Sequence, residues 1–317
     1  MTKTGTYRYL CCGLRVQADL PLPGLCERPE EQGAPTDVRI QRGAVPDAPA
    51  RRVIEGGRGP TWAASGDELL LEVPGVVRFQ LAAGGGIVYE PAPGRTPHDF
   101  AAFLMGSAFG ALLHQRGCLV LHGSAIETGG GAALFCGVSG IGKSSLAAAL
   151  SAAGYPLIAD DMCAIRFGEG APTLPNDGRS LKLWADAAGH LKAATGEQVR
   201  RGIGKYWVTP AASHVGGGAI PVRRIYFLRD AQPPHAAGIE RLSAVDGAEL
   251  LQRAAYRRRL IRVLGQEAHW LQQSVQLLRH AEAFWFTRER RLEALPESVA
   301  MLNAHWNAQP EASHAAA

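Results

Sequence analysis

The chain is 317 residues long, enough for about two domains. Hydrophobic residues make up 46% of it and charged residues 20%, which is typical of a globular protein and not of a disordered one. The formal net charge is only +4, far below the excess that a protein needs to neutralise a long phosphate backbone, so no nucleic acid is expected as a partner.

Targeting and redox signals point to the cytoplasm. The first twenty residues carry no apolar core of a signal peptide, and no run of about 18 apolar residues occurs anywhere, so no membrane partner is expected. The six cysteines include no CxxC pair, which favours reduced thiols over a disulfide framework or a zinc site.

Residues 1–97 are predicted to form a small β-rich domain that serves as a recognition module or platform. Short apolar runs separated by turn residues are typical of such a domain. The expected strands are 7–16, 37–42, 68–73, 76–81 and 87–90.

Residues 98–306 are predicted to form an α/β domain, followed by a disordered tail at 307–317. It opens with a helix at 99–116, for which Thr96 is the expected N-cap and Pro97 the first helical residue. A loop-rich stretch is expected at 168–218. The other expected elements are strands at 118–121, 132–136, 155–161, 224–228 and 283–287, and helices at 145–153, 246–263, 267–281 and from Pro296 onward.

A phosphate-binding loop is the strongest motif in the chain. Residues 137–144 (GVSGIGKS) match GxxxxGK[ST], and an apolar strand precedes them while a helix follows. Backbone amides of such a loop contact phosphate oxygens, Lys143 would reach the β- and γ-phosphates, and Ser144 would bind Mg²⁺. The alternative is a glycine-rich turn that merely begins a helix. The expected nucleotide-binding residues are Gly137, Ser139, Gly140, Ile141, Gly142, Lys143, Ser144 and Ser145.

Two carboxylates follow the next strand. The unit 132–161 has the length of a βαβ crossover, about 30 residues, which would make the strand ending in Asp160 and Asp161 parallel to the first, with its carboxyl end beside the loop. One carboxylate could bind the metal, and the other could accept a proton from a hydroxyl nucleophile. The alternative is a solvated Asp-Asp turn.

A histidine and a basic loop complete the predicted site. His122 ends a strand that precedes the phosphate-binding strand, and could orient a carboxylate or keep it ionised. The alternative is an ordinary strand-end histidine. Lys205, one of only five lysines, lies with Arg200 and Arg201 in a glycine-rich loop that could contact phosphoryl oxygens, unless this loop is simply solvated.

These motifs together resemble the catalytic domain of the HPr kinase/phosphorylase family. That family has a His-Gly pair, a GxSGxGKS loop and a strand ending in Ala-Asp-Asp, which here are His122-Gly123, residues 137–144 and residues 158–161. The resemblance implies an ATP- and Mg²⁺-dependent protein serine kinase in which Asp160 is the base, Asp161 lies near the metal and His122 supports the base. It also implies a possible homo-oligomer, because relatives assemble into rings.

The chain departs from that family at two positions. Ser145 stands where the family usually has Glu after GKS. The later family signature, which belongs to the reverse reaction, is only echoed by residues 200–206 (RRGIGKY), so a kinase is expected in preference to a phosphorylase.

The N-terminal half resembles that of the HPr-kinase-like proteins of lasso-peptide biosynthesis. The shared features are residues 9–14 (YLCCGL), residues 20–24 (LPLPG) and a helix ending in residues 113–117 (LHQRG). The resemblance implies phosphorylation of a serine, often the C-terminal one, of a ribosomally made precursor peptide. Two alternatives stay open: a kinase of a folded carrier protein or of a small-molecule hydroxyl, and a nucleotide-binding regulatory or adaptor protein.

Overall fold

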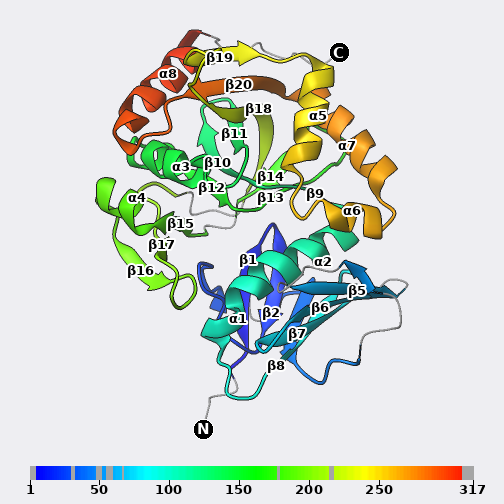
Figure 1. Cartoon of the computed structure of the whole chain (residues 1–317). Coiled ribbons are helices and arrows are strands. Elements are labelled where there is room, and N and C mark those ends of the chain that lie inside the picture. Colours follow the sequence, from blue (N-terminus) through cyan, green and yellow to red (C-terminus); the bar gives the residue numbers. More distant parts are fainter. Residues whose placement is uncertain are drawn as a thin grey trace.

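The computed structural model describes residues 5–29, 33–47, 52–54, 60–65, 68–176, 179–213 and 218–308. The fold is mixed α/β with several sheets, and in Figure 1 the blue N-terminal sheet lies below an α/β part coloured green to red. The predicted disordered tail, 307–317, lies outside the described residues from position 309 onward. Within the described part, no helix is both long and apolar enough to cross a membrane.

The N-terminal part is an eight-stranded sheet with the order β1-β2-β3-β8-β7-β6-β5-β4. Alternate residues of these strands, such as Leu69 and Leu71 in one and Phe79 and Leu81 in the next, are fully buried on one face. The strands are β1 (Tyr7–Cys11), β2 (Leu14–Ala18), β3 (Val38–Arg42), β4 (Arg52–Ile54), β5 (Thr61–Ser65), β6 (Glu68–Val73), β7 (Val77–Ala82) and β8 (Gly86–Pro91).

The single strand predicted at 7–16 is instead a hairpin. Cys12 and Gly13 both have positive φ, at 51° and 70°, and form the two-residue turn between β1 and β2. Two successive positive φ values match the right-handed twist of a hairpin, which is why such turns join adjacent strands. The apolar run is therefore interrupted by a turn that the residues Cys-Cys-Gly do not signal strongly.

The long helix predicted at 99–116 runs as α1 (Pro97–Phe103), a π-helical segment η2 (Leu104–Ala108) and α2 (Phe109–Gln115). Thr96 and Asp99 form the capping box that begins it. Phe100 packs against Phe79 and Tyr89 of the sheet, with ring centroids 6.4 and 5.2 Å away. The helix thus contributes to the same hydrophobic core as the N-terminal sheet.

The second part is built on a seven-stranded sheet with the order β12-β10-β11-β18-β20-β19, to which β14 adds by pairing with β18. Strands β11, β18 and β20 are parallel neighbours, so their carboxyl ends share one edge. The strands are β10 (Gly123–Thr128), β11 (Gly131–Cys136), β12 (Leu157–Asp160), β14 (Thr173–Pro175), β18 (Ala219–Asp230), β19 (Gly238–Arg241) and β20 (Glu282–Arg288).

Strands β11 and β12 run in the same direction, as predicted, but they are not adjacent in the sheet. Strand β10 lies between the two and pairs antiparallel with both, so β11 and β12 run the same way without touching. The end of β12 at Asp160 faces Ser124, next to Gly123, which faces the end of β11 at Cys136. The carboxyl ends of β11 and β12 therefore meet at the same edge of the sheet, on either side of the start of β10.

Helices cover both faces of this sheet (Figure 1). Side chains of β11, β18 and β20 pack on one face against α3 and α8, and on the other face against α5 and α7. The helices are α3 (Lys143–Ala152), α5 (Ala244–Ala254), α6 (Arg259–Val263), α7 (Glu267–His280) and α8 (Leu295–Ala308).

Two predictions for this part were wrong. The helix expected at 246–263 is broken into α5 and α6. The backbone oxygen of Ala254 accepts a hydrogen bond from the nitrogen of His122, and Ala255 forms an isolated β-bridge with Leu121. Arg257 then takes a positive φ of 49°, which an α-helix does not allow. The stretch 168–218 is not only loop, since it holds a three-stranded antiparallel sheet in the order β15-β17-β16. Its elements are β15 (Leu181–Trp184), α4 (Ala185–His190), β16 (Thr195–Gln198) and β17 (Lys205–Val208).

Candidate active site

The phosphate-loop motif lies between β11 and α3, as its pattern predicts. Gly137, Gly140 and Gly142 all have positive φ, and the helix begins at Lys143 directly after Gly142. The Lys143 Nζ atom donates hydrogen bonds to the backbone oxygens of Gly137 and Val138, at 2.9 and 3.1 Å. The lysine is 7% exposed, and burial lowers its pKa against the opposing effect of nearby acidic groups. The Lys143 ammonium therefore occupies the inside of the loop and bonds to two of its backbone oxygens.

The remaining loop residues differ in exposure. Ser139 and Gly140 are exposed, whereas Ile141 is buried in the core against α3 and anchors the loop to the domain. Ser144 and Ser145 are half-buried in the first turn of the helix. Backbone amides at the start of a helix form a ready site for an anion, so this turn presents the geometry that phosphate binding needs.

Arg288, which the sequence did not single out, supports the loop from behind. It ends β20, is 3% exposed, and its Nη2 atom donates to the backbone oxygen of Ile141 at 3.0 Å. A Cβ atom at Gly142 would lie 2.4 Å from that same nitrogen. Glycine is thus required at position 142 both for its φ of 94° and for the room that Arg288 occupies.

Asp160 is the centre of a buried hydrogen-bond cluster. Its Oδ1 atom accepts from the hydroxyls of Ser124 and Ser144, both at 2.7 Å, and its Oδ2 atom accepts from the backbone nitrogen of Lys182 at 3.0 Å. The residue is 3% exposed. The carboxylate at the end of β12 is thereby fixed directly beside the hydroxyl that the loop motif assigns to Mg²⁺.

The Ser144 and Asp160 oxygens fit a magnesium site. Octahedral Mg²⁺ with ligands at about 2.1 Å places neighbouring ligands about 3 Å apart, close to the 2.7 Å that separates these two atoms. Among the described residues, no group of three or more His, Cys, Asp or Glu side chains could hold a metal ion. Mg²⁺ does not need one, because it is usually bound by one or two protein ligands together with phosphate oxygens and water.

Asp161 lies on the other side of the cluster, in an ion pair. Its Oδ2 atom is 2.8 Å from Lys182 Nζ, and its Oδ1 atom is 3.4 Å from His122 Nδ1. Burial alone would raise the pKa of Asp161, but Lys182, with His122 and Lys205, holds it well below its usual range. The expected partner of Asp161 was the metal beside Ser144; the structure places Lys182 and His122 against it, and Asp160 beside Ser144.

His122 is at the predicted edge of the sheet, but for a different reason. It lies between β9 (Leu119–Leu121) and β10, and because β10 runs antiparallel to β11, the start of β10 meets the end of β11. Its Nδ1 atom is 3.0 Å from the backbone oxygen of Asp161, a contact that it can make only as a donor. Burial and the charge of Lys143 lower the pKa of His122 below its ordinary value.

Of the basic loop, Lys205 lies near the carboxylates. It begins β17 opposite Trp184 of β15, and its charge contributes to lowering the pKa values of both Asp161 and Lys143. Arg200 instead lies over the ring of Phe103, 5.5 Å from its centroid. The pKa of Asp99, in the first turn of α1, is lowered mainly by the hydrogen bonds from Thr96, and the charge of Arg201 adds to this effect.

A small cavity of about 20 Å³ adjoins the two carboxylates. It has room for about one water molecule, and therefore for one hydroxyl oxygen. No residue of the phosphate loop lines it. Its lining residues are Pro23, Gly24, Leu25, Met105, Asp160, Asp161, Met162, Arg179, Ser180, Lys182 and Trp207.

Sequence reasoning missed Ser124, Lys182 and Arg288. Ser124 directly follows the His-Gly pair, and Lys182 is one of five lysines, so both carried a weak signal. Arg288 carried none, since a lone arginine after an apolar strand is common.

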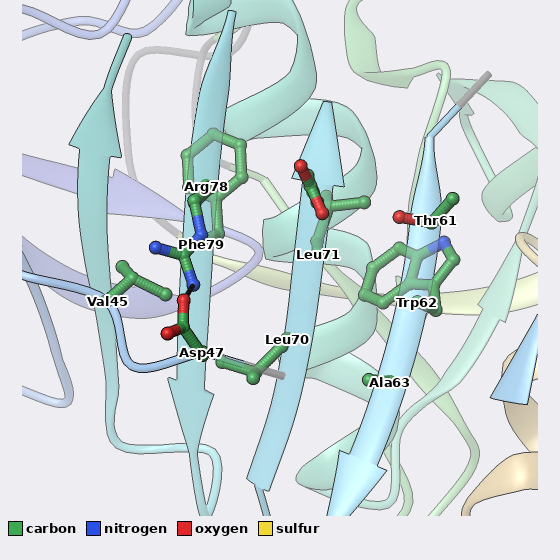
Figure 2. Close-up of a pocket in the computed structure, with 10 residues that line it drawn as sticks. Val45, Asp47, Thr61, Trp62, Ala63, Leu70, Leu71, Arg78 and Phe79 are labelled. Carbon is green, nitrogen blue, oxygen red and sulfur yellow. Dashed lines mark hydrogen bonds and ion pairs between the residues drawn. The ribbon is translucent and has the colours of Figure 1, made fainter. Parts of the chain in front are cut away.

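A second hollow, of about 300 Å³, lies on the N-terminal sheet and holds none of the predicted site residues (Figure 2). The Arg78 guanidinium at its rim is 3.2 Å from Asp47. It is lined by Val45, Asp47, Thr61, Trp62, Ala63, Leu70, Leu71, Glu72, Arg78 and Phe79.

Comparisons with known proteins identify no family for this chain. No family model matches it, and no curated protein matches it. Among solved structures it is similar to the HPr(Ser) kinase/phosphatase from Coxiella burnetii, with a TM-score of 0.34 and 11% sequence identity. The alignment covers 60% of this chain and 97% of that one. A likeness this distant does not assign the chain to that family.

Proposed function

We propose that this protein is an ATP- and Mg²⁺-dependent kinase that transfers the γ-phosphoryl group to a serine hydroxyl of a peptide. The observation that carries the proposal is the contact between Ser144, in a complete phosphate-loop motif, and the buried carboxylate of Asp160, at 2.7 Å. A glycine-rich turn that only begins a helix has no need of a buried lysine within it or of a carboxylate held beside its serine.

The loop residues would bind and orient the phosphates. The amides of residues 137–145 would donate to phosphate oxygens. Lys143, which bonds to two loop carbonyls, would exchange these for the β- and γ-phosphates. Ser144 would hold Mg²⁺ beside Asp160, and the ion when bound neutralises charge on the phosphate oxygens. Arg288 supports the loop through its hydrogen bond to the backbone oxygen of Ile141.

Asp160 is the proposed proton acceptor. As the acceptor oxygen forms its bond to the γ-phosphorus, the bond from that phosphorus to the bridging oxygen of ADP breaks, and the hydroxyl proton passes to Asp160. Its Oδ1 atom lies at Ser144, and its Oδ2 atom lies at Lys182, a residue that lines the small cavity. Asp160 is therefore the carboxylate that links the phosphate side to the cavity.

Asp161, His122, Lys182 and Lys205 would set the charge around this step. Lys182 and Lys205 offset the negative charge of two adjacent carboxylates, and His122 donates a hydrogen bond to the backbone oxygen of Asp161. Phosphoryl transfer needs little covalent chemistry from the protein, so positioning and electrostatics account for most of the catalysis.

A peptide serine is the proposed acceptor, and the C-terminal serine of a lasso-type precursor peptide is the specific substrate. This part of the proposal is supported by the resemblance of residues 9–14, 20–24 and 113–117 to the kinases of that pathway. The cavity beside Asp160 and Asp161 is consistent with one hydroxyl oxygen.

Transfer of label from γ-labelled ATP tests the proposal. Wild-type protein with Mg²⁺ should label a serine peptide, whereas Lys143→Ala should lose nucleotide affinity and Asp160→Asn should bind ATP but transfer nothing. Unchanged transfer by either variant would refute the assignment. ATP binding with no transfer to any peptide, folded carrier protein or small-molecule hydroxyl would favour a nucleotide-binding regulatory protein.

A further inference from the structure

One face of the three-stranded sheet displays lysines and tryptophans beside the carboxylates. Strands β15 and β17 place Lys182 opposite Trp207 and Trp184 opposite Lys205, and directly opposed residues of an antiparallel pair project to the same face. Leu181, which alternates with them, is buried against α3 on the other face. The four side chains, which we call the Lys/Trp face, therefore project together.

The Lys/Trp face runs outward from the catalytic carboxylates. Lys182 pairs with Asp161 and lies over the Trp207 ring, with its nitrogen 5.0 Å from the ring centroid. One residue pair further along, the Trp184 side chain is exposed, at 54%. Lys205 lies beside it and is close enough to Asp161 to influence its pKa.

The N-terminal part supplies the opposite wall. A turn formed by Pro23, Gly24 and Leu25 lines the small cavity, and the backbone oxygen of Gly24 accepts a hydrogen bond from the nitrogen of Ser180 at 2.9 Å. Gly24 contacts Trp207 so closely that a Cβ atom there would lie 2.2 Å from the indole ring. Such an approach leaves room only for glycine.

The N-terminal turn is itself firmly held. Leu22, buried within it, donates its backbone N–H to the hydroxyl of Tyr9 at 3.0 Å, and Leu20 is buried beside it. The turn therefore reaches the catalytic part as a preformed element of the N-terminal fold. Figure 1 shows β15, β16 and β17 on the side of the α/β part that faces the N-terminal sheet.

We infer that the acceptor binds between the two parts as an extended acidic peptide segment, along the Lys/Trp face and against the 23–25 turn. Lys182 is paired with Asp161, whereas the Lys205 ammonium makes no hydrogen bond or ion pair with another described residue, so an acidic group of the ligand would pair with Lys205. The exposed indole of Trp184 and the half-buried side chain of Leu25 supply contact area next to the charges. The inference rests on the proposed function and adds to it where the acceptor lies and what charge it carries.

Binding of labelled peptides to the full chain tests the inference without requiring catalysis. The probes are three ten-residue peptides that each end in their single serine, preceded by two Glu, two Gln or two Lys residues. Fluorescence anisotropy with a non-hydrolysable ATP analogue and Mg²⁺ gives each affinity, and transfer from γ-labelled ATP is measured in parallel.

The Glu peptide should bind most tightly and the Lys peptide least, and added salt should reduce this difference. Trp184→Ala should weaken binding of the Glu peptide roughly tenfold, the size of effect expected for an interface tryptophan. Leu25→Ala should weaken it as well. The matched control is Leu271→Ala, because Leu271 on α7 is also 54% exposed, and it should bind peptide and nucleotide analogue like the wild type.

Equal affinity for the three peptides, or equal binding by the Trp184→Ala and Leu271→Ala variants, would overturn the inference. Charge-dependent binding without phosphoryl transfer would refute the proposed function and leave the docking surface standing. Phosphoryl transfer that depends on neither peptide charge nor Trp184 would support the proposed function and refute the docking surface.

Discussion

Replacing Lys182 by Met should destabilise the protein by about 2 kcal/mol at neutral pH. The substitution keeps most of the aliphatic stem over Trp207 but removes the ammonium 2.8 Å from Asp161. The two side chains are 13% and 25% exposed, so solvent screens the pair only in part. A hydrogen bond to a charged group contributes about 1.5–3 kcal/mol, which sets the expected loss.

The loss should also depend on pH in a defined direction. Because the pKa of Asp161 is lowered in the folded protein, the pair stabilises the fold above the unfolded pKa of about 3.9 and loses this effect as the pH falls through the folded value. The difference between variant and wild type should therefore be full at pH 7 and shrink in strong acid.

Urea unfolding of both proteins at a series of pH values measures this difference. Lys192→Met is the control, because Lys192 is exposed, and it should change stability by less than about 0.5 kcal/mol. A Lys182→Met variant as stable as Lys192→Met at pH 7, or a loss that grows toward acid, would refute the electrostatic account of Asp161.

Three further predictions concern neighbouring groups. Ser124→Ala removes one hydroxyl that donates to Asp160, so it should lower the free energy of unfolding by about 1.5–3 kcal/mol and slow phosphoryl transfer. The control Ser151→Ala, at another buried serine, should reduce stability without slowing transfer. Equal effects of the two variants on transfer would contradict this prediction. Stability should fall from pH 7 to 5, because the folded chain lowers the pKa of His122 and the unfolded chain binds more protons; His122→Gln should flatten that slope in urea titrations. Gly142→Ala should raise the dissociation constant for ATP, by calorimetry, since Arg288 and the φ of 94° both exclude a Cβ; unchanged affinity would be inconsistent with the loop geometry.

The phosphate loop could be predicted because its signal is local. Eight consecutive residues between a strand and a helix specify both the turn and the direction of its amides, and the structure has that strand and that helix around them. The position of His122 was predicted for the wrong reason, since strand β10 behind it was not recognised. Its residues, GSAIET, include only one large apolar side chain and show no clear alternation of apolar and polar positions.

Contacts made by distant segments could not be predicted in the same way. Lys182 meets Asp161 only because β15 pairs with β17 and packs beside β12, in a stretch whose many glycines predict a loop-rich segment. Likewise, nothing local indicates that Gly24 touches Trp207, since that contact depends on how the two parts of the chain pack.

Product analysis by tandem mass spectrometry tests the central claim most directly. Serine peptides incubated with the protein, ATP and Mg²⁺ should carry phosphoserine, and the label of γ-labelled ATP should be found in it. The Asp160→Asn variant should bind ATP with nearly wild-type affinity and yield no phosphoserine. Phosphoserine formed equally well by Asp160→Asn, or release of free phosphate with no phosphorylated peptide, would contradict the account.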